Sequence, residues 1–444
     1  MKKLNKIIFK KVSLFFLLIC LGIVNSTVAQ QTPASKQTEG IAITGATAHV
    51  GNGEVIENSI IVFKDGKLTT VQSMTNFKAD IKGMQIIEGS GKHVYPGFII
   101  PNSTLGLVEI DAVRATDDDA EIGGWNPHIR SLIAYNAESK IVESMRPNGV
   151  LIGQITPRGG RVSGTSSVVQ FDAWNWEDSV IKEDDGIHMS WPNNFSRGRW
   201  WLGEDPAMKI NESYEEQITE LHDYFNASKT HNSGDKNKVN LPYEALDGIF
   251  DGSKKLYIDV DDEKGITDAI NFAKQQGVED LVLIGCYEAM KVVDLIKKNN
   301  VSILVRRPHT TPEATDDDYD KPFKLAAELT NRGIIVALQA AGQMERMNSR
   351  NLPFYAGTVA AHGLAKEEAL KLVTLNPAKI LGIDDHYGSL KVGKSATLFI
   401  SEGDALDMRT NIISRAFIDG RDISLESHQT ELYKRYSEKY KAQK

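Results

Sequence analysis

Two short-period segments of alternating hydrophobic and polar positions lie near the ends of the chain. Between residues 40 and 91, and again between 385 and 423, short apolar runs are separated by turn signals such as Asp65-Gly66-Lys67 and Asp419-Gly420-Arg421. This spacing is typical of short strands joined by tight turns. Because the two segments lie at opposite ends of the chain, we expect them to combine into one small β-sandwich.

The segment from 92 to 384 has a different pattern of hydrophobic positions. Its apolar runs do not alternate, which indicates strands buried on both faces, and helical patterns follow several of them. Seven such runs are clear: Val94–Ile100, Val150–Ile155, Ser167–Phe171, Leu256–Val260, Leu281–Ile284, Ser302–Val305 and Ile334–Leu338. With a suspected eighth strand, this α/β pattern predicts a (β/α)₈ TIM-like barrel rather than an open sheet.

Two stretches match neither the pattern of the terminal β segments nor that of the barrel. Residues from about 175 to 252 interrupt the barrel pattern and are expected to form an insertion, partly helical at Tyr214–Phe225. The charged stretch from 424 to 444 is expected to form an exposed C-terminal helix.

The first 29 residues have the layout of a secretory signal peptide. Five lysines precede the 13-residue apolar run Val12–Val24, and small residues lead up to Ala29. A membrane span needs about 20 apolar residues, so cleavage after Ala29 is expected rather than a permanent anchor. A lipid anchor on Cys20 is disfavoured, because Ile19 stands where a small residue is needed. We therefore predict an exported protein, periplasmic or extracellular, with no membrane attachment after cleavage.

The charge of the chain argues against one class of partner. Lys and Arg number 51 against 59 Asp and Glu, a net charge of −8, and loss of the signal's five lysines changes the balance to 46 against 59, or −13. Nucleic-acid binding depends on neutralising phosphates with positive side chains, so no nucleic-acid partner is expected. After cleavage only Cys286 remains, which excludes an intrachain disulfide.

Three motifs occur in a fixed order around the predicted barrel: Lys92–Ile99 (KHVYPGFI) before it, then Leu375–Gly382 (LNPAKILG) and Gly388–Ala396 (GSLKVGKSA) near its end. In this order the chain resembles the amidohydrolase superfamily over roughly residues 40–423, and most closely its imidazolonepropionase-like branch. The resemblance implies a barrel enzyme that hydrolyses carbon–nitrogen bonds with a bound metal ion.

The same resemblance implies metal ligands that this sequence lacks. Where the family carries a His-x-His pair, with both imidazoles on one side of the strand, the chain has Asn102 and Thr104. Gly285 stands where a ligand histidine belongs, and Ala341 stands at or within a residue of the catalytic aspartate. Thr397 replaces the usual aspartate near the closing β motif.

Carboxylates survive only in the fourth-strand region, at Asp259 and Asp261. A catalytic Zn²⁺ needs three or more good protein ligands, and without the ion there is no activated water. We therefore predict no catalytic residues of the family's kind, no bound metal and no other cofactor. Asp259 and Asp261 could hold Ca²⁺, but a solvated acidic strand end is favoured, because Ca²⁺ takes about six or more oxygens.

A glycine-rich loop, Thr156–Ser167, follows the second predicted barrel strand and contains Arg158 and Arg161. Adjacent glycines let backbone N–H groups converge on an anion, and the arginines add positive charge, so the loop suits a carboxylate or phosphate ligand. Its spacing matches neither a P-loop nor the dinucleotide fingerprint. A barrel loop without a ligand is therefore the alternative.

Aromatic residues and one histidine give further candidates for ligand binding. All six tryptophans lie between residues 125 and 201, among them Trp174 and Trp176. Such rings could line a groove for a peptide or sugar or form a protein interface, and the alternative is a small secondary core under the insertion. His309 follows a barrel strand, where functional loops gather, although a single histidine there is more often a hydrogen-bonded loop residue.

Three functions remain open at the level of sequence. The leading hypothesis is an exported amidohydrolase-like protein that has lost its metal site and serves as a non-catalytic binding or partner subunit. Its partner would be a related active amidohydrolase subunit, a small molecule or a peptide, and it could form oligomers. The second is a metal-dependent hydrolase of cyclic amide or peptide bonds with atypical ligands. The third is a periplasmic ligand-binding module.

Overall fold

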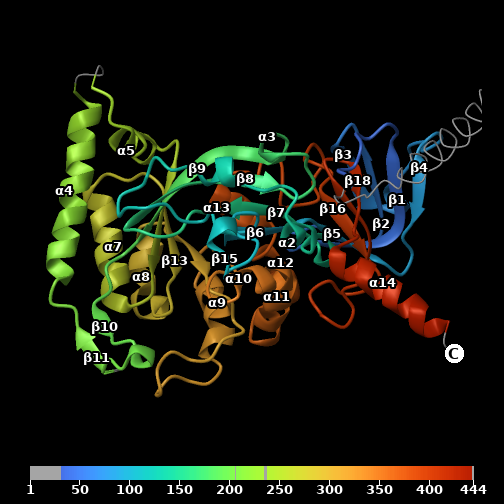
Figure 1. The fold of residues 1–444 in the computed structure, drawn as a ribbon. Coiled ribbons are helices and arrows are strands. Elements are labelled where there is room, and N and C mark those ends of the chain that lie inside the picture. The colour runs from blue at the N-terminus through green and yellow to red at the C-terminus, as the bar shows by residue number, and fades with distance from the viewer. Residues whose placement is uncertain (1–31, 206, 235–237, 443–444) are drawn as a thin grey trace, which may run out of the picture. The chain divides into compact units, whose positions relative to one another are not determined.

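The computed structural model describes residues 32–205, 207–234 and 238–442, and Pro33 onward forms one compact unit (Figure 1). The predicted signal peptide and Cys20 lie outside the described residues. Within them, no helix combines the length and the apolar character that a bilayer crossing requires.

Both ends of the chain contribute to one eight-stranded sheet, which confirms the predicted composite β unit. Its order is β18-β17-β16-β5-β1-β2-β3, with β4 paired to β1. Apolar side chains from both ends share its core, where the rings of Phe63 and Phe417 meet edge to face at 5.0 Å. The strands are β1 (Ile41–His49), β2 (Val55–Lys64), β3 (Lys67–Ser73), β4 (Gln85–Glu88), β5 (His93–Pro96), β16 (Leu398–Ser401), β17 (Ile413–Ile418) and β18 (Arg421–Ile423).

A second eight-stranded sheet curls into a nearly closed barrel, as predicted. A hydrogen bond from Asn102 Nδ2 to Gln339 Oε1, 3.3 Å long, connects its first strand with the residue that follows its last. The strands in sheet order are β6 (Phe98–Ser103), β7 (Val150–Ile155), β8 (Val162–Gln170), β9 (Val180–Ser190), β12 (Lys255–Val260), β13 (Leu281–Gly285), β14 (Ser302–Val305) and β15 (Val336–Leu338).

Two of the predicted barrel strands differ from the expectation. The run Val94–Ile100 is divided between β5 of the composite sheet and β6 of the barrel. Gly97 makes the crossing between sheets, and a Cβ there would lie 2.9 Å from Thr397 Cγ2 and 3.0 Å from Leu151 Cδ1. The second difference is the direction of β8, which runs antiparallel to both β7 and β9, so the barrel is not parallel throughout.

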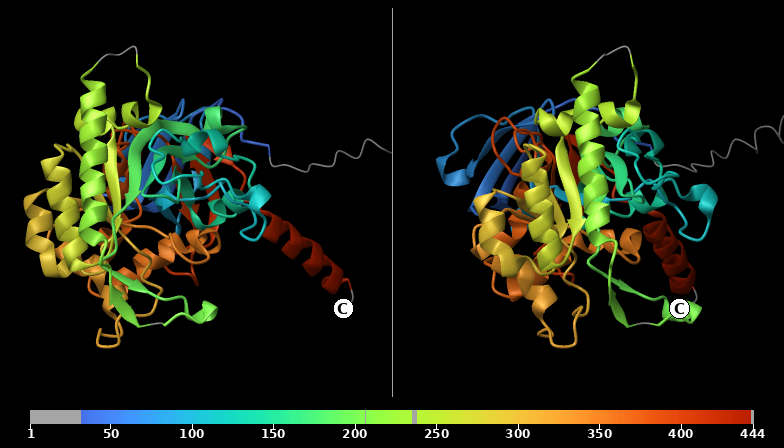
Figure 2. Two further views of the ribbon diagram at one scale, coloured as in Figure 1. Left: turned by 60° about the vertical axis from the view of Figure 1, so that its left-hand side comes forward. Right: turned by 90° about the vertical axis from the view of Figure 1, so that its left-hand side faces the viewer.

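The insertion is shorter than the predicted span of about 175–252, because β9 (Val180–Ser190) is a barrel strand. The middle of β9 is polar, so the sequence pattern does not predict a buried strand there. The side chain of Asp185 is nevertheless fully buried, and hydrogen bonds rather than apolar contacts compensate it. The inserted part after Ser190 contains the hairpin of β10 (Phe195–Arg197) and β11 (Met208–Ile210), which extends beyond the body in both views of Figure 2.

Helices pack on the outside of the barrel. In the insertion, α4 packs against α7 through the rings of Phe225 and Phe272, 4.9 Å apart. Lys321–Asn331 forms α9, one of the helices that follow the barrel strands, and the charged C-terminal stretch forms the exposed helix α14. The helices are α2 (Lys140–Glu143), α3 (Trp176–Ser179), α4 (Tyr214–Asn232), α5 (Leu241–Glu244), α6 (Asp247–Phe250), α7 (Glu263–Gln275), α8 (Val293–Lys298), α9 (Lys321–Asn331), α10 (Glu345–Asn348), α11 (Leu352–Ala361), α12 (Lys366–Lys371), α13 (Leu375–Leu381) and α14 (His428–Lys441).

One buried carboxylate connects the composite sheet to the barrel. Asp172, in the turn between β8 and β9, accepts hydrogen bonds from Arg146 Nη1 at 2.9 Å and Arg421 Nη1 at 2.7 Å. Its Oδ2 also accepts from the backbone N–H of Ala34 at 2.9 Å, which holds the N-terminal lead-in. The side chain of Asp172 is 1% exposed, against 5% for Arg146 and 15% for Arg421. The three charges therefore depend on one another for compensation.

Replacing Asp172 with Asn should strongly destabilise the fold. The change leaves two largely buried guanidinium groups without their counter-charge, a loss of about 3–5 kcal/mol in the free energy of unfolding for a broken buried ion pair. Urea denaturation of the two proteins measures the difference. Asp178→Asn, at an exposed site on α3, is the matched control and should leave the unfolding midpoint unchanged. Equal midpoints for parent and Asp172→Asn would contradict this role.

Candidate functional site

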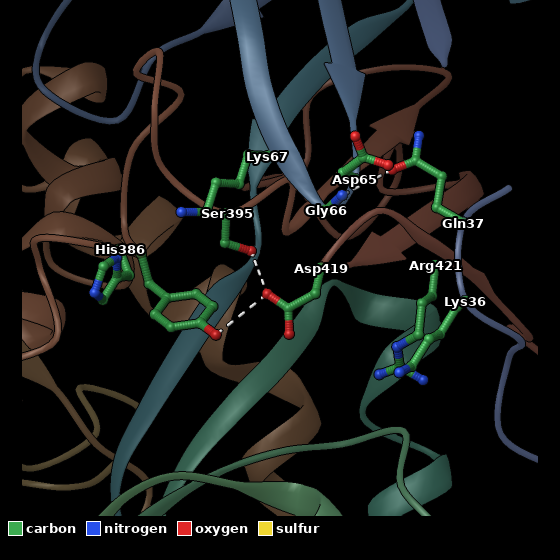
Figure 3. Close-up of a pocket in the computed structure, with 10 residues that line it drawn as sticks. Lys36, Gln37, Asp65, Gly66, Lys67, His386, Ser395, Asp419 and Arg421 are labelled. Carbon is green, nitrogen blue, oxygen red and sulfur yellow. Dashed lines mark hydrogen bonds between the residues drawn. The ribbon is translucent and has the colours of Figure 1, made fainter. Parts of the chain in front are cut away.

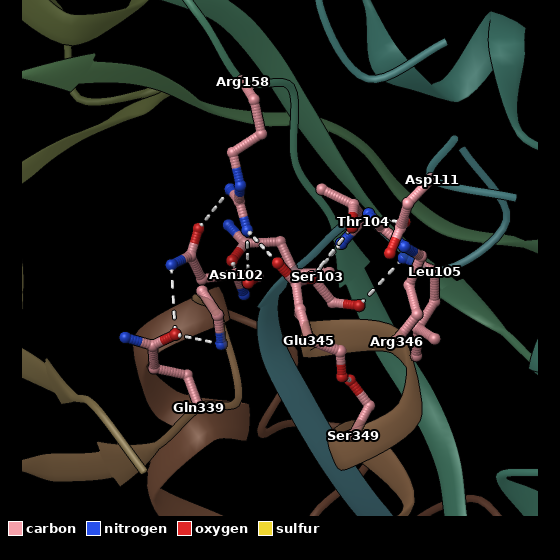
Figure 4. A network of polar contacts seen from close by, with 12 residues as sticks. Asn102, Ser103, Thr104, Leu105, Asp111, Arg158, Gln339, Glu345, Arg346 and Ser349 are labelled. Atoms are coloured by element: carbon pink, nitrogen blue, oxygen red, sulfur yellow. Dashed lines mark hydrogen bonds and ion pairs between the residues drawn. The ribbon is translucent and has the colours of Figure 1, made fainter. Parts of the chain in front are cut away.

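The predicted ligand positions Asn102 and Thr104 lie at the carboxyl end of β6, at the barrel mouth (Figure 4). Both are buried. The backbone of Asn102 has φ +51°, a left-handed conformation that asparagine tolerates better than most residues. This conformation turns the end of the strand so that both its carbonyl and its side chain meet the same partner.

That partner is Arg158, whose guanidinium occupies the mouth beside Asn102. Its Nη1 donates to Asn102 Oδ1 at 2.7 Å and its Nη2 donates to Asn102 O at 2.9 Å. Nη2 also forms an ion pair with Glu345 Oε2 at 3.2 Å. The other oxygen of Glu345 accepts from the N–H of Thr104 at 2.6 Å and from its hydroxyl at 3.1 Å. An arginine–glutamate pair therefore holds both positions where the family has its histidine pair.

The segment after β15 completes this side of the mouth. Gln339 is fully buried, and its Oε1 accepts from Asn102 Nδ2 and, at 2.8 Å, from the backbone N–H of Ala341. Its Nε2 has no hydrogen-bond partner among the described residues. Ala341 therefore lies at the mouth as a backbone donor, with no side chain that could bind an ion.

A second guanidinium lies on the opposite side of the mouth. Arg306 Nη2 donates to Asp259 Oδ1 and to Asp261 Oδ2, both at 2.8 Å, and Nε donates to Asp261 Oδ1 at 3.3 Å. Burial alone would lower the pKa of Arg306, but the charges of Asp261 and Asp259 outweigh it and raise that pKa. Burial raises the pKa of Asp259, and the charge of Arg306 opposes this shift. The two surviving carboxylates are thus already paired with a cation.

Gly285 lies against this pair. Its φ is +89°, and an added Cβ would overlap Asp261 Oδ1 and approach Arg306 Nε to 3.1 Å. An imidazole at this position would need both the backbone and the ion pair to move. A cavity of about 320 Å³ opens beside Gly285 and Arg306, with Tyr287, Arg307 and Glu313 also in its wall.

These residues do not fit the metal ion that the fold family implies. Arginine and amide N–H groups are donors and cannot ligate a cation. Across the described parts of the chain, no group of three or more His, Cys, Asp or Glu side chains could hold a metal. Three carboxylates at the mouth, Glu345, Asp259 and Asp261, are each paired with an arginine.

Sequence reasoning missed a polar network inside the barrel. Asp185 accepts hydrogen bonds from Ser166 Oγ at 2.7 Å, Tyr257 OH at 2.8 Å and Gln154 Nε2 at 3.0 Å. His188 lies in β9, where its ring stacks on Tyr257 at 4.3 Å. Burial, and then the charge of Arg158, lower the pKa of His188 well below its usual range, so the ring stays neutral.

This network reaches the mouth. Gln154 Oε1 accepts from the backbone N–H of Asn102 at 2.8 Å. The polar middle of β9 and the glutamine in β7 were the available signals in the sequence. Arg306 and Glu345 were also not predicted, because their partners at the mouth lie far away in the sequence.

The remaining candidates occupy three separate places and make no contact with Arg158 among the interactions of the described residues. Arg161 donates to Ser190 O at 2.9 Å and contacts Gln217 of α4. Trp174 and Trp176 lie in the β8–β9 turn, at the opposite end of the barrel, with Trp174 61% exposed and Trp176 packed on the core. His309 shares a 2.7 Å hydrogen bond with Thr358 Oγ1.

The other tryptophans also have separate surroundings. Trp191 is buried and donates to Tyr214 OH at 3.0 Å, whereas Trp125 stacks on Tyr224 at 4.2 Å. The tryptophans that cluster in the sequence are therefore divided between the two ends of the barrel, and they do not form one surface.

Comparison with known proteins agrees with this fold. Residues 314–423 match the sequence model of the amidohydrolase family, a span that includes two of the three motifs. An amidohydrolase from Thermotoga maritima MSB8 is similar in structure, with a TM-score of 0.74 and 22% identity over 86% of this chain and 99% of that protein. No curated protein matches the chain by sequence.

More distant structures share the architecture. An Xaa-Pro dipeptidase with bound methionine has a TM-score of 0.54 and 12% identity, covering 87% of this chain and 100% of its own. A zinc-bound adenosine deaminase from Xanthomonas campestris has a TM-score of 0.52 and 13% identity, covering 93% of this chain and 99% of its own. The resemblance of this chain to the amidohydrolase superfamily is therefore confirmed, by sequence over residues 314–423 and by fold over most of its length.

Proposed function

We propose that this chain is an exported, non-hydrolytic binding protein built on the amidohydrolase barrel. The observation that carries the proposal is the pair of guanidinium groups, Arg158 and Arg306, at the positions around which the family assembles its metal ligands. Each arginine is held by two or more charge-assisted hydrogen bonds, which are the stronger kind in proteins.

The electrostatics of the mouth support this proposal. A divalent cation would have to enter between two fixed positive charges and displace each from its carboxylate partner. Its remaining partners would be the amide of Asn102 and the hydroxyl of Thr104, which are poor ligands for Zn²⁺. Without a metal-activated water the family's hydrolysis has no nucleophile. Among the described residues, no cluster of metal-binding side chains favours the alternative of a hydrolase with atypical ligands.

A binding role agrees with what the site retains. The cavity beside Gly285 and Arg306, about 320 Å³, has the size of a small-molecule pocket. Export rests on the signal-like first 29 residues. A small molecule, a peptide or a related active subunit is the partner that we propose for the mouth.

The mature protein should bind less than one Zn²⁺ per chain at low micromolar zinc. Elemental analysis after dialysis against zinc measures this ratio. The triple variant Asn102→His, Thr104→His, Arg158→Ala is the matched comparison, because it restores a histidine pair beside the freed carboxylate of Glu345. We expect more zinc in the variant than in the parent. A stoichiometric, chelator-resistant zinc ion in the parent would refute the proposal.

Arg158→Met should destabilise the protein by about 1.5–3 kcal/mol, because Glu345 and Asn102 lose charge-assisted hydrogen bonds in a buried setting. Chemical denaturation followed by tryptophan fluorescence reports the change. Arg409→Met is the control: Arg409 pairs only with Asp407 on the surface, where ion pairs contribute little. If Arg158→Met unfolds at the same denaturant concentration as Arg409→Met, Arg158 does not organise the mouth.

A further inference from the structure

A larger cavity, about 590 Å³, lies away from the barrel mouth at the tips of the composite sheet (Figure 3). Four separate segments form it: the N-terminal lead-in at Lys36, the β2–β3 turn at Lys67, the stretch from Tyr387 to Ser395, and the β17–β18 turn at Asp419. One of its lining residues, Arg421, reaches Asp172 beyond the end of β8, whereas Arg158 precedes the start of β8. The two sites are therefore at opposite ends of the barrel.

The wall of this cavity is held by specific contacts. The amide of Gln37 joins the lead-in to the first turn, since its Oε1 accepts from Gly66 N at 2.9 Å and its Nε2 donates to Phe63 O at 3.2 Å. Gly420 has φ +73° and no room for a Cβ, because Gln37 Oε1 fills that space. Arg421 also donates to Ala34 O at 3.3 Å, so the lead-in is fixed on both sides.

One side of the cavity presents acceptors. Asp419 Oδ1 accepts from Ser395 Oγ at 2.6 Å and from Tyr387 OH at 3.2 Å. Burial, and then the charge of Asp419, raise the pKa of Tyr387, so its phenol keeps the proton that it donates. Asp65, at the tip of the first turn, adds a second carboxylate. Carboxylates with open lone pairs are suitable acceptors for ligand hydroxyls.

Two lysines line the same cavity, in addition to Arg421 (Figure 3). Lys36 and Lys67 are exposed, and among the described residues neither ammonium group has a hydrogen bond or ion pair. This is notable in a chain with an excess of acidic residues, where most lysines near a carboxylate would find a partner. The two ammonium groups are therefore available to an anionic group of a ligand.

From these contacts we infer that the cavity binds an acidic saccharide, such as a uronic-acid unit. The lysines would pair with the sugar carboxylate, while Asp65 and Asp419 would accept hydrogen bonds from its hydroxyls. A simple anion such as phosphate fits less well, because it would fill only part of the cavity and would leave Asp65 and Asp419 without hydroxyl donors. The volume exceeds what one small ion needs and suits a mono- or disaccharide.

Isothermal titration of the full mature chain with digalacturonic acid tests this inference. The matched ligand is its dimethyl ester, which keeps the hydroxyls and most of the shape but carries no charge. We expect saturable binding of the acid and binding of the ester that is weaker by about tenfold, the size expected for the loss of two partly exposed charge contacts.

Variants locate the binding. The double substitution Lys36→Met with Lys67→Met should weaken binding of the acid by about tenfold, and Lys64→Met, on the same hairpin but outside the cavity wall, should leave it unchanged. Thermal melting of each variant verifies that the fold is retained. No saturable binding of the acid, equal binding of the ester, or an unaffected double variant would overturn the inference. Displacement of the acid by an equal concentration of inorganic phosphate would do so too, as it would identify a simple anion site.

Discussion

The arrangement of this protein depends on a buried carboxylate that serves three parts of the chain at once. Asp172 compensates Arg146 from the barrel, Arg421 from the composite sheet and the backbone N–H of Ala34 from the lead-in. A buried charge is costly unless it is both paired and hydrogen-bonded. Since no one of these groups can be withdrawn without exposing the others to that cost, the contact specifies how the sheet built from the chain ends is attached to the barrel.

At the barrel mouth, buried charges are also compensated by charges of opposite sign within the chain. A metal site concentrates acceptors around a cation, whereas here the cations are covalently part of the chain. Arg158 and Arg306 bring fixed positive charge to the mouth, and Glu345, Asp259 and Asp261 neutralise it. The network behind them, from Gln154 to Asp185, satisfies polar groups that apolar packing could not. In this chain, ion pairs between its own side chains occupy the place at the barrel mouth where the amidohydrolase fold can hold a metal ion.

Much of this could be predicted from the sequence, for identifiable reasons. The composite sheet and the barrel could be predicted because their signals are local. Uninterrupted apolar runs indicate buried strands, and the motif Gly388–Ala396 marks the part of the composite sheet near the end of the chain. The replacement of ligands at Asn102, Thr104, Gly285 and Ala341 could also be read from single positions. Pairing over long sequence separations could not. Nothing near Arg158 indicates that Glu345 will be its partner, and β9 is buried through side-chain hydrogen bonds that no periodicity reveals. The tryptophans show the opposite case. They are close together in the sequence, which suggested one shared surface, but they lie at opposite ends of the barrel.

The reversed direction of β8 has a consequence for Arg158. In a parallel barrel, the residues after a strand belong to a loop that continues into a helix and can shift independently of the sheet. Here residues 156–161 connect β7 to its antiparallel neighbour β8, and the far end of the connection is held by β9, because Val162 pairs with Met189. Arg158 is thus carried by a connection between two strands of the barrel and not by a loop that leads into a helix.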